Sequence, residues 1–296
     1  MDIFSPEFRL KFAERQSAPI SAVPTPLQLW NDCCQGDGGG VGLADGWMVI
    51  LGGNPKFGKT MIALDMLRVA MMSGRRPGFI SLEMNTFTAA SRIMAMITNT
   101  PVWKLEKRGY SERQFTEVWK TIAPAENDFG LYVDDRVHYG IDSIMQSMES
   151  LLANGYNYFV VDYLQLAAIG SEESINRAVV EVTSRLRAFA KDNNVPVLAL
   201  SQFNRETSKN YVDTPQPQGC HGGMIVEASG DQIILIDHSR YEKTLKGART
   251  WLELTNRHGP SASIPIEWYW EGLRLRQADD DQHDQWPTNA KTEAGR

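Results

Sequence analysis

The sequence predicts an α/β protein with a mainly parallel sheet flanked by helices and an antiparallel extension at its C-terminal end. Short apolar runs alternate with segments of helical spacing as far as residue 236. Continuous apolar strands separated by helices are typical of a parallel sheet covered on both faces. Beyond residue 245, strand-like runs follow one another without helices between them, which indicates antiparallel pairing.

The expected elements can be placed in order along the chain. Six strands are expected in the alternating part, at residues 47–51, 78–82, 131–134, 158–162, 195–201 and 232–236. Helices are expected between the first five of these strands, at residues 60–73, 86–97, 112–121, 141–153 and 174–193. The antiparallel extension is expected to consist of strands at residues 249–254, 263–268 and 273–276.

The composition is that of a folded chain with an acidic balance. Apolar residues make up 42% and charged residues 22% of the 296 residues, values that exclude an intrinsically disordered class. The formal net charge is −6. The surface is therefore not coated with phosphate-binding charge, and any nucleic-acid site must be local, such as one loop or a channel lining.

Charge and proline content divide the chain into three parts. Residues 1–25 carry a short amphipathic helix pattern followed by prolines, and we expect an N-terminal arm with a linker helix there. Residues 26–277 form the folded domain. Residues 278–296 hold five acidic and two basic residues, which is half of the net charge, and we expect a disordered acidic tail.

Cysteine usage and the N-terminal sequence predict a cytoplasmic protein without membrane association. Three cysteines are too few for a disulfide framework, and with the five histidines they do not form zinc-ligand spacings. The first residues lack the basic and apolar regions of a secretory signal. The longest apolar stretch, at residues 159–169, contains polar residues and is too short to span a bilayer.

A phosphate-binding loop is the most specific motif in the chain. Residues 53–60 match G-x-x-x-x-G-K-[ST] between an expected strand and an expected helix. In such a loop, backbone N–H groups surround phosphates, the lysine reaches the β- and γ-phosphates, and the final hydroxyl binds Mg²⁺. The phosphate-binding residues are expected to be Gly53, Asn54, Pro55, Lys56, Phe57, Gly58, Lys59 and Thr60, with Thr60 also a metal ligand.

Two carboxylates follow strands and suit the chemistry around a bound phosphate. Asp162 ends an apolar strand, where it can hold magnesium together with Thr60. Glu83 follows the strand at 78–82, which we expect to lie beside the strand of the phosphate loop, and it can orient an attacking water. It can equally be a solvated acid or a helix cap. Tyr163, and not an acid, follows Asp162, which favours Glu83 as the catalytic base.

Gln202 and Arg257 are weaker candidates. Gln202 ends the strand at 195–201 and precedes a long polar stretch. An amide there can bond a γ-phosphate and report its loss to the loop beyond, or it can simply anchor that loop. Arg257 lies in a tight turn between two strand-like runs. This position suits an arginine finger supplied to a neighbouring subunit, although an ordinary surface arginine fits the spacing as well.

Several segments together resemble the RecA-fold motor domain of hexameric replicative DNA helicases of the DnaB type. They occur in the order of that family and span about residues 26–277. The segments are GGNPKFGKT (52–60), FISLEM (79–84), VVDYLQL (160–166), SRLRAFAKDNNVPVLALSQFNR (184–205), VEASGDQIILI (226–236) and LTNRHGP (254–260). The resemblance implies a RecA-like P-loop NTPase core.

The resemblance also implies roles for the candidate residues. Lys59 and Thr60 would bind ATP–Mg²⁺, and Asp162 would bind the metal. Glu83 would be the catalytic base and Gln202 the sensor of the γ-phosphate. The finger, Arg257, would act in trans across a subunit interface of a ring, expected to be a hexamer.

The implied activity is ATP-dependent DNA unwinding with 5′-to-3′ movement on single-stranded DNA. The loop around residues 205–224 would line a central channel and hold the strand. A primase or a loader is a further partner that the family implies. The DNA contacts are expected at Arg205, Lys209, His221, Gly222 and Gly223.

Two departures from the family pattern leave rival functions open. The family usually has a lysine two residues before the finger, where this chain has Thr255, and the N-terminal domain that recruits primase is not among these residues. One rival is a RecA-type or clock-type ATPase with the same fold. The other is a DNA-replication binding or loading factor that uses ATP as an assembly switch and does not unwind DNA.

Overall fold

A computed structural model describes most of the expected folded domain. The described residues are 21–34, 42–106, 130–136, 140–167, 175–204, 214–244, 247–269 and 272–278, with the single positions 10, 112, 113, 116, 120 and 209. Arg205, most of the expected helix at 112–121 and the expected tail from residue 279 onward lie outside the described residues. Within the described part, no helix combines the length and apolar character that crossing a membrane requires.

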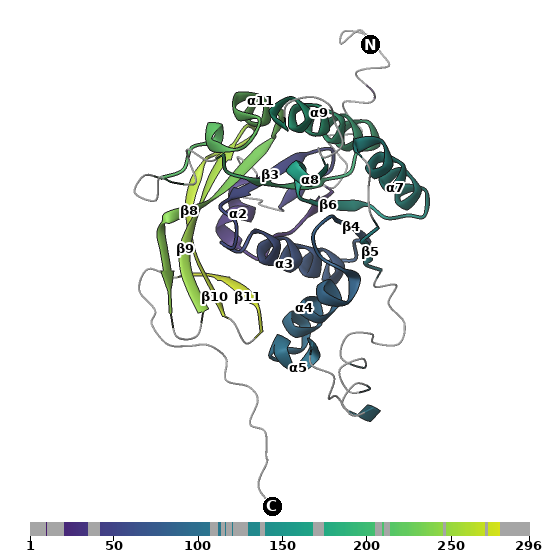
Figure 1. The fold of residues 1–296 in the computed structure, drawn as a ribbon, viewed down its shortest axis with the longest axis vertical. Helices are drawn as coiled ribbons and strands as arrows, with labels where there is room; N and C mark the ends of the chain where they lie inside the picture. Colours follow the sequence, from purple (N-terminus) through teal and green to yellow (C-terminus); the bar gives the residue numbers. More distant parts are fainter. Residues whose placement is uncertain are drawn as a thin grey trace, which may run out of the picture.

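A nine-stranded sheet forms the centre of the fold (Figure 1). Its strands are β3 (Met48–Gly53), β4 (Pro77–Ser81), β5 (Tyr132–Asp134), β6 (Tyr158–Asp162), β7 (Val197–Gln202), β8 (Gln232–Lys243), β9 (Gly247–Asn256), β10 (Ala262–Tyr269) and β11 (Arg274–Gln277). In the order β8-β3-β7-β6-β4-β5 every pair is parallel, and β9, β10 and β11 continue from β8 with antiparallel pairing. The predicted α/β architecture is therefore confirmed.

The long helices lie where helical spacing predicts them. They are α3 (Lys59–Met72), α4 (Thr86–Thr98), α7 (Ile141–Ala153) and α9 (Ile175–Asn193). Several short elements were not predicted, because a single turn leaves little periodic signal. They are α2 (Gln28–Cys33), α5 (Val102–Glu106), α8 (Leu164–Ala167), the 3₁₀ turn η1 (Pro217–Gly219), α11 (Gly223–Ser229) and a small sheet of β1 (Ala22–Val23) and β2 (Leu43–Ala44).

Two apolar cores sit on opposite faces of the sheet, as expected for strands buried on both sides. In β3, Val49 and Leu51 face the core that holds α2, α3 and α4. Met48 and Ile50, which alternate with them, face the core that holds α7 and α9. Figure 1 shows the corresponding layers, with α3 and α4 on one side and α7 and α9 on the other. The period of two along a pleated strand explains this division.

Residues 21–34 pack against the body of the domain. The β1 strand pairs with β2, and the Thr25 side chain is buried, where its hydroxyl donates to the carbonyl of Leu27. The Trp30 indole N–H donates to the side chain of Gln232 at 3.0 Å, which fastens α2 to the start of β8. The division drawn at residue 25 therefore falls inside packed structure, because β1 already belongs to the domain.

The strand that precedes Glu83 does not lie beside the strand of the phosphate loop, contrary to our expectation. The β7 and β6 strands separate β4 from β3 in the sheet. A parallel crossover connection can skip neighbouring positions, so adjacency along the chain does not ensure adjacency in the sheet. The carboxyl ends of β3, β7, β6 and β4 nevertheless open along one edge, and they carry the phosphate loop, Gln202, Asp162 and Glu83 in that order.

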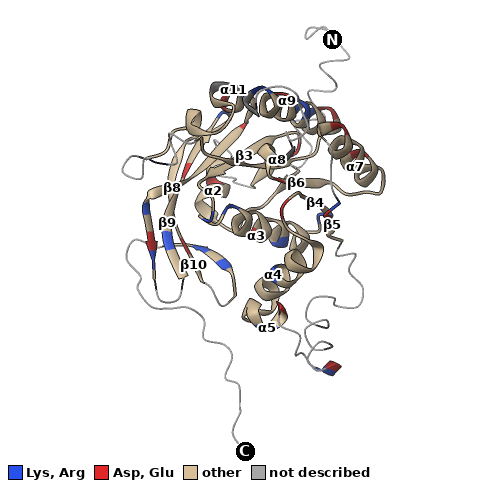
Figure 2. Ribbon diagram, viewed as in Figure 1, with Lys and Arg blue, Asp and Glu red and all other residues tan. Residues whose placement is uncertain are grey.

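The antiparallel extension is cross-linked by ion pairs between its strands. Figure 2 shows basic and acidic segments alternating along these strands. Arg249 and Arg276 both pair with Glu267, and Arg240 pairs with Asp237 on its own strand. The extension is fixed against the parallel part because β8 belongs to both.

Candidate functional site

The phosphate loop connects β3 to α3 and has the backbone that its sequence requires. Gly58 has a φ of 91° and Lys56 a φ of 69°, so the loop passes through the left-handed region twice. A Cβ at Gly58 would lie 2.2 Å from the Trp268 ring, which packs on the loop from β10. Phe57 meets the Tyr241 ring of β8 at a centroid distance of 4.7 Å. The antiparallel extension therefore supports the loop from outside.

Lys59 begins α3 with a buried ammonium group. Its Nζ donates to the carbonyl of Gly53 at 3.0 Å and to the carbonyl of Asn54 at 2.9 Å. Burial lowers the pKa of Lys59 to about 8, although the nearby carboxylates of Asp162 and Glu83 favour its charged form. An ammonium held in this way lies close to the loop backbone, where a phosphate can accept its protons.

Asn54 and the pair formed by Thr60 and Asp162 fit a phosphate ligand and a hard cation. Neither amide atom of the buried Asn54 side chain has a hydrogen-bond partner among the residues that the structure describes. The Thr60 hydroxyl donates to Asp162 Oδ2 at 2.8 Å. Burial, together with the charge of Glu83, raises the pKa of Asp162 to about 6. Oxygen donors of this kind are those that Mg²⁺ prefers, so these residues could hold a magnesium nucleotide.

Glu83 lines a pocket of about 270 Å³ together with Thr60 and Asp162. Its lining residues are Thr60, Glu83, Met84, Asn85, Thr88, Arg92 and Asp162. Glu83 reaches this pocket because β6, which ends in Asp162, pairs with β4, and the Leu82 N–H donates to the Asp162 carbonyl at 2.9 Å. The Asn85 side chain caps α4 by accepting the Thr88 N–H. The cap of this helix is therefore Asn85 and not Glu83.

Tyr163 and Gln165 connect the end of β6 to the end of β7. The peptide bond between Asp162 and Tyr163 is cis. Burial, followed by the charge of Glu83, raises the pKa of Tyr163, while the nearby side chain of Gln202 acts to lower it. Gln165 Oε1 accepts the Gln202 N–H at 3.2 Å. Tyr163 therefore lies between the candidate base and the candidate sensor.

Gln202 is joined directly to the loop that we expect to contact DNA. Its carbonyl accepts the His221 N–H at 3.2 Å, and the neighbouring residue, Phe203, forms an isolated bridge with Cys220. Gly222 has a φ of 89°, and a Cβ there would lie 2.4 Å from the Val226 side chain. His221, Gly222 and Gly223 are partly exposed beside this junction. Lys209 is exposed, and the structure does not describe Arg205.

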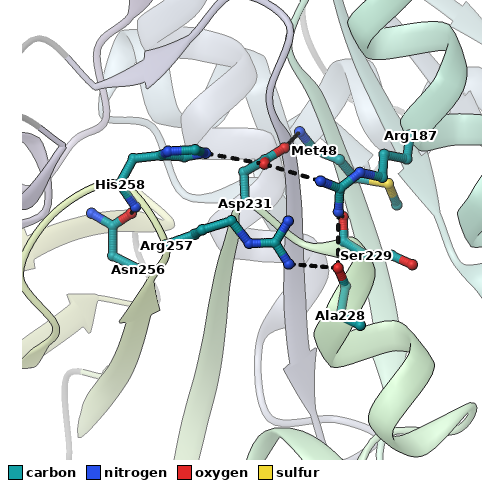
Figure 3. Close-up of polar contacts among 8 residues, drawn as sticks. All are labelled: Met48, Arg187, Ala228, Ser229, Asp231, Asn256, Arg257 and His258. Atoms are coloured by element: carbon teal, nitrogen blue, oxygen red, sulfur yellow. Dashed lines mark hydrogen bonds and ion pairs between the residues drawn. The ribbon is translucent and has the colours of Figure 1, made fainter.

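Arg257 is held against its own chain (Figure 3), near the amino end of β3, whereas the phosphate loop follows the carboxyl end of that strand. Its guanidinium donates to the carbonyl of Ala228 at 2.6 Å, near the C-terminal end of α11. Arg187 of α9 donates to the same carbonyl at 2.9 Å. The backbone N–H of Arg257 donates to the carbonyl of Asp231 at 3.0 Å. The structure does not bring Arg257 to the pocket of this chain that contains Glu83.

Asp231 ties the turn of Arg257 to the centre of the sheet. Its carboxylate accepts the Met48 N–H at 2.9 Å and lies 3.2 Å from the His258 ring (Figure 3). The His258 ring also stacks on Trp47 at a centroid distance of 5.0 Å. The turn is therefore anchored on both sides of the residue that it presents.

The chain matches the family described as the DnaB-like helicase C-terminal domain over residues 37–277. It belongs to that family. The replicative DNA helicase DnaB of Leifsonia xyli subsp. xyli is 30% identical over 279 residues, which are 91% of this chain and 58% of that protein. A probable plasmid replicative DNA helicase of Chlamydia trachomatis serovar L2 is 28% identical over 256 residues, 85% of this chain and 54% of its own. The chain thus spans about half the length of the curated relatives that it matches.

Solved structures share the fold of this DnaB-like domain. The ATPase domain of G40P superimposes with a TM-score of 0.76 at 17% identity, covering 94% of this chain and 100% of that one. A DnaB-like replicative helicase, whose structure was reported with its interactions with primase, gives 0.75 at 17% identity and covers 93% and 68%. The RecA-like core that the sequence predicts is confirmed at the level of the fold.

Two residues of the pocket region were missed by the sequence analysis of this DnaB-like domain. Arg92 lines the pocket from α4, and Tyr163 lies between Glu83 and Gln202. The sequence did contain a signal for Arg92, because positions 85, 88 and 92 share one face of a helix whose first turn follows Glu83. Tyr163 had none beyond its place after Asp162, since its contact depends on how two strands are paired.

Proposed function

We propose that this chain is the ATP-hydrolysing motor domain of a ring-forming DNA helicase that acts in replication in the cytoplasm. The observation that supports this most strongly is the gathering of Thr60, Asp162 and Glu83 around one pocket next to the phosphate loop. The substrate is ATP with Mg²⁺. Thr60 and Asp162 are the residues proposed to hold the metal, which neutralises charge on the phosphates when bound.

In the proposed reaction Glu83 orients and deprotonates the water that attacks the terminal phosphate. Its carboxylate lies in the pocket beside the metal-binding pair and is not used as a helix cap, because Asn85 caps α4. Lys59 binds the phosphates from the loop side. Gln202 senses the terminal phosphate, and the proximity of both Gln202 and Glu83 to Tyr163 supports this role.

The proposed coupling to DNA runs through the end of β7. Gln202 bonds His221 through its backbone, so a movement of Gln202 on loss of the γ-phosphate is passed to the segment with Gly222 and Gly223. We propose that this segment, with Lys209 and Arg205, contacts single-stranded DNA. The few cations involved agree with a chain whose net charge is −6.

The proposed assembly is a homo-oligomeric ring, a hexamer, with Arg257 acting on the ATP of the neighbouring subunit. Arg257 lies away from its own phosphate loop, since the antiparallel β9 returns its turn to the amino end of β3, and the loop follows the carboxyl end of β3. A primase or loader is a further proposed partner. Of the family's two expected trans cations, this chain supplies one, because Thr255 stands at the other position.

Steady-state ATP hydrolysis with and without single-stranded DNA tests this proposal. The wild-type chain is expected to hydrolyse ATP, and faster when DNA is added. Glu83→Gln should bind ATP normally but lose about two to four orders of magnitude in turnover, the usual effect of removing a general base. Glu149→Gln, the same change on the exposed face of α7, is the matched control. Near-normal turnover in Glu83→Gln would place the base elsewhere, and binding without turnover in the wild type would favour the ATP-switched factor.

A further inference from the structure

Arg92 occupies a distinctive place in the pocket next to the phosphate loop. It is the only lysine or arginine among the described residues that line this pocket, and two of the other lining residues are the carboxylates Glu83 and Asp162. Its side chain is half-buried. An arginine in such a place is normally found with an acceptor, because its five N–H donors lose water on burial.

No such acceptor is present within the described part of the chain. Arg92 forms neither an ion pair nor a hydrogen bond with any described residue, although it shares the pocket with Glu83 and Asp162 and its charge acts to lower the pKa of Asp162. By contrast, Arg68 on the preceding helix pairs with Asp65 at 2.6 Å. Among the described residues no hydrogen-bond acceptor meets the donors of Arg92, and they can bind a ligand that carries its own oxygen acceptors.

The helix directs this side chain toward the metal-binding pair. A helical side chain leans toward the N-terminus of its helix, so Arg92 extends over Thr88 toward the first turn of α4. That turn comes soon after Glu83 in the chain, and Thr60 and Asp162 line the same pocket as Arg92. Arg92 thus faces the part of the site where a phosphate group bound to the metal would end.

We propose that Arg92 binds the terminal phosphate of ATP from within the same subunit and makes the pocket favour ATP over ADP. This inference rests on the proposed function, since it takes ATP as the nucleotide. A terminal phosphate brings extra negative charge and oxygens that match the planar fork of a guanidinium. Without Arg92, the carboxylates of Glu83 and Asp162 would face that charge with only the metal and Lys59 to offset it.

Equilibrium binding of two magnesium nucleotides separates this role from a structural one. The probes are ADP and a non-hydrolysable ATP analogue, measured by calorimetry on the intact chain. Arg92→Gln is expected to weaken binding of the analogue by about 10- to 100-fold, the usual effect of losing a hydrogen bond to a charged group, while ADP affinity changes less than about twofold. Arg92→Lys, which keeps the charge but not the fork, should recover part of the analogue affinity.

Arg185→Gln is the matched control. This arginine pairs with Asp142 on the surface, on the opposite side of the sheet, and its replacement should alter neither affinity. Equal losses for ADP and the analogue in Arg92→Gln, or no loss for either, would overturn the inference. A wild-type chain that binds neither nucleotide would instead overturn the proposed function, so the two failures are distinguishable.

Discussion

The ammonium group of Lys59 is buried, and its charged form therefore lowers the free energy of unfolding of the ligand-free protein. Burial lowers its pKa from 10.5 to about 8. Between these two values the unfolded chain binds a proton that the folded chain does not. The free energy of unfolding contributed by this group therefore rises with pH from about 8 to about 10.5, by about 3 kcal/mol at most.

Replacement of Lys59 by methionine should remove that dependence. Relative to Lys59→Met, the wild-type chain is expected to gain stability as the pH is raised through this range. Denaturant unfolding of the two ligand-free proteins at several pH values between 7.5 and 10 measures the difference. Other groups, such as Cys34, whose pKa burial raises to about 11, titrate in both proteins and cancel. Parallel stability curves would show that Lys59 keeps its ordinary pKa in the fold.

At the scale of single residues, the site residues that follow one another in one continuous segment could be predicted from the sequence. The contacts that depend on strand pairing could not. The loop from Gly53 to Thr60 has a local pattern that needs no knowledge of the sheet. Asp162 could be paired with Thr60 because their chemistry is complementary, and the two are bonded in the structure. The contact of Tyr163 with Gln202 could not be predicted, since it depends on the pairing of β6 with β7.

Among the elements, strands and long helices were predictable and their lateral order was not. Apolar runs bounded by turn residues indicate where a strand lies, but a parallel crossover can place the next strand beside or beyond its predecessor. For this reason β4 was expected next to β3, whereas β7 and β6 lie between the two strands. Glu83 still reaches the pocket because all parallel strands end at the same edge of the sheet.

Helix α11 connects two candidate sites. It begins at Gly223 beside His221, in the segment proposed to contact DNA, and its last turn holds the carbonyl that binds Arg257. Arg187 donates to the same carbonyl. A finger that serves the neighbouring subunit must leave this contact or extend past it. In this structure Arg257 is instead bound to its own chain through the carbonyl of Ala228.

Arg257→Ala should fold and bind nucleotide, yet hydrolyse ATP about three to five orders of magnitude more slowly, the usual effect of an arginine finger. Mixing Arg257→Ala subunits with Glu83→Gln subunits tests the trans assignment. Some interfaces in mixed rings would combine an intact Glu83 with an intact Arg257 from the neighbour, so partial recovery of ATP hydrolysis is expected. If the finger acted in cis, every subunit would carry one defect, and mixed rings would stay inactive.

For the whole molecule, charge and size restrict how the protein can engage DNA. With a net charge of −6, the proposed DNA contact relies on a few cations near one loop. Repetition of that loop around a ring multiplies the contacts, because each phosphate neutralised adds to the affinity. Single-stranded DNA would then contact several subunits of the proposed ring at once, so that DNA movement would be coupled to ATP turnover between subunits.

Strand separation on a forked DNA with a free 5′ tail tests this link most directly. The wild-type chain, given ATP and Mg²⁺, is expected to release the labelled strand, and the Glu83→Gln chain is expected to bind the same fork without releasing it. A wild-type chain that binds the fork and hydrolyses ATP but leaves the duplex intact would contradict the account.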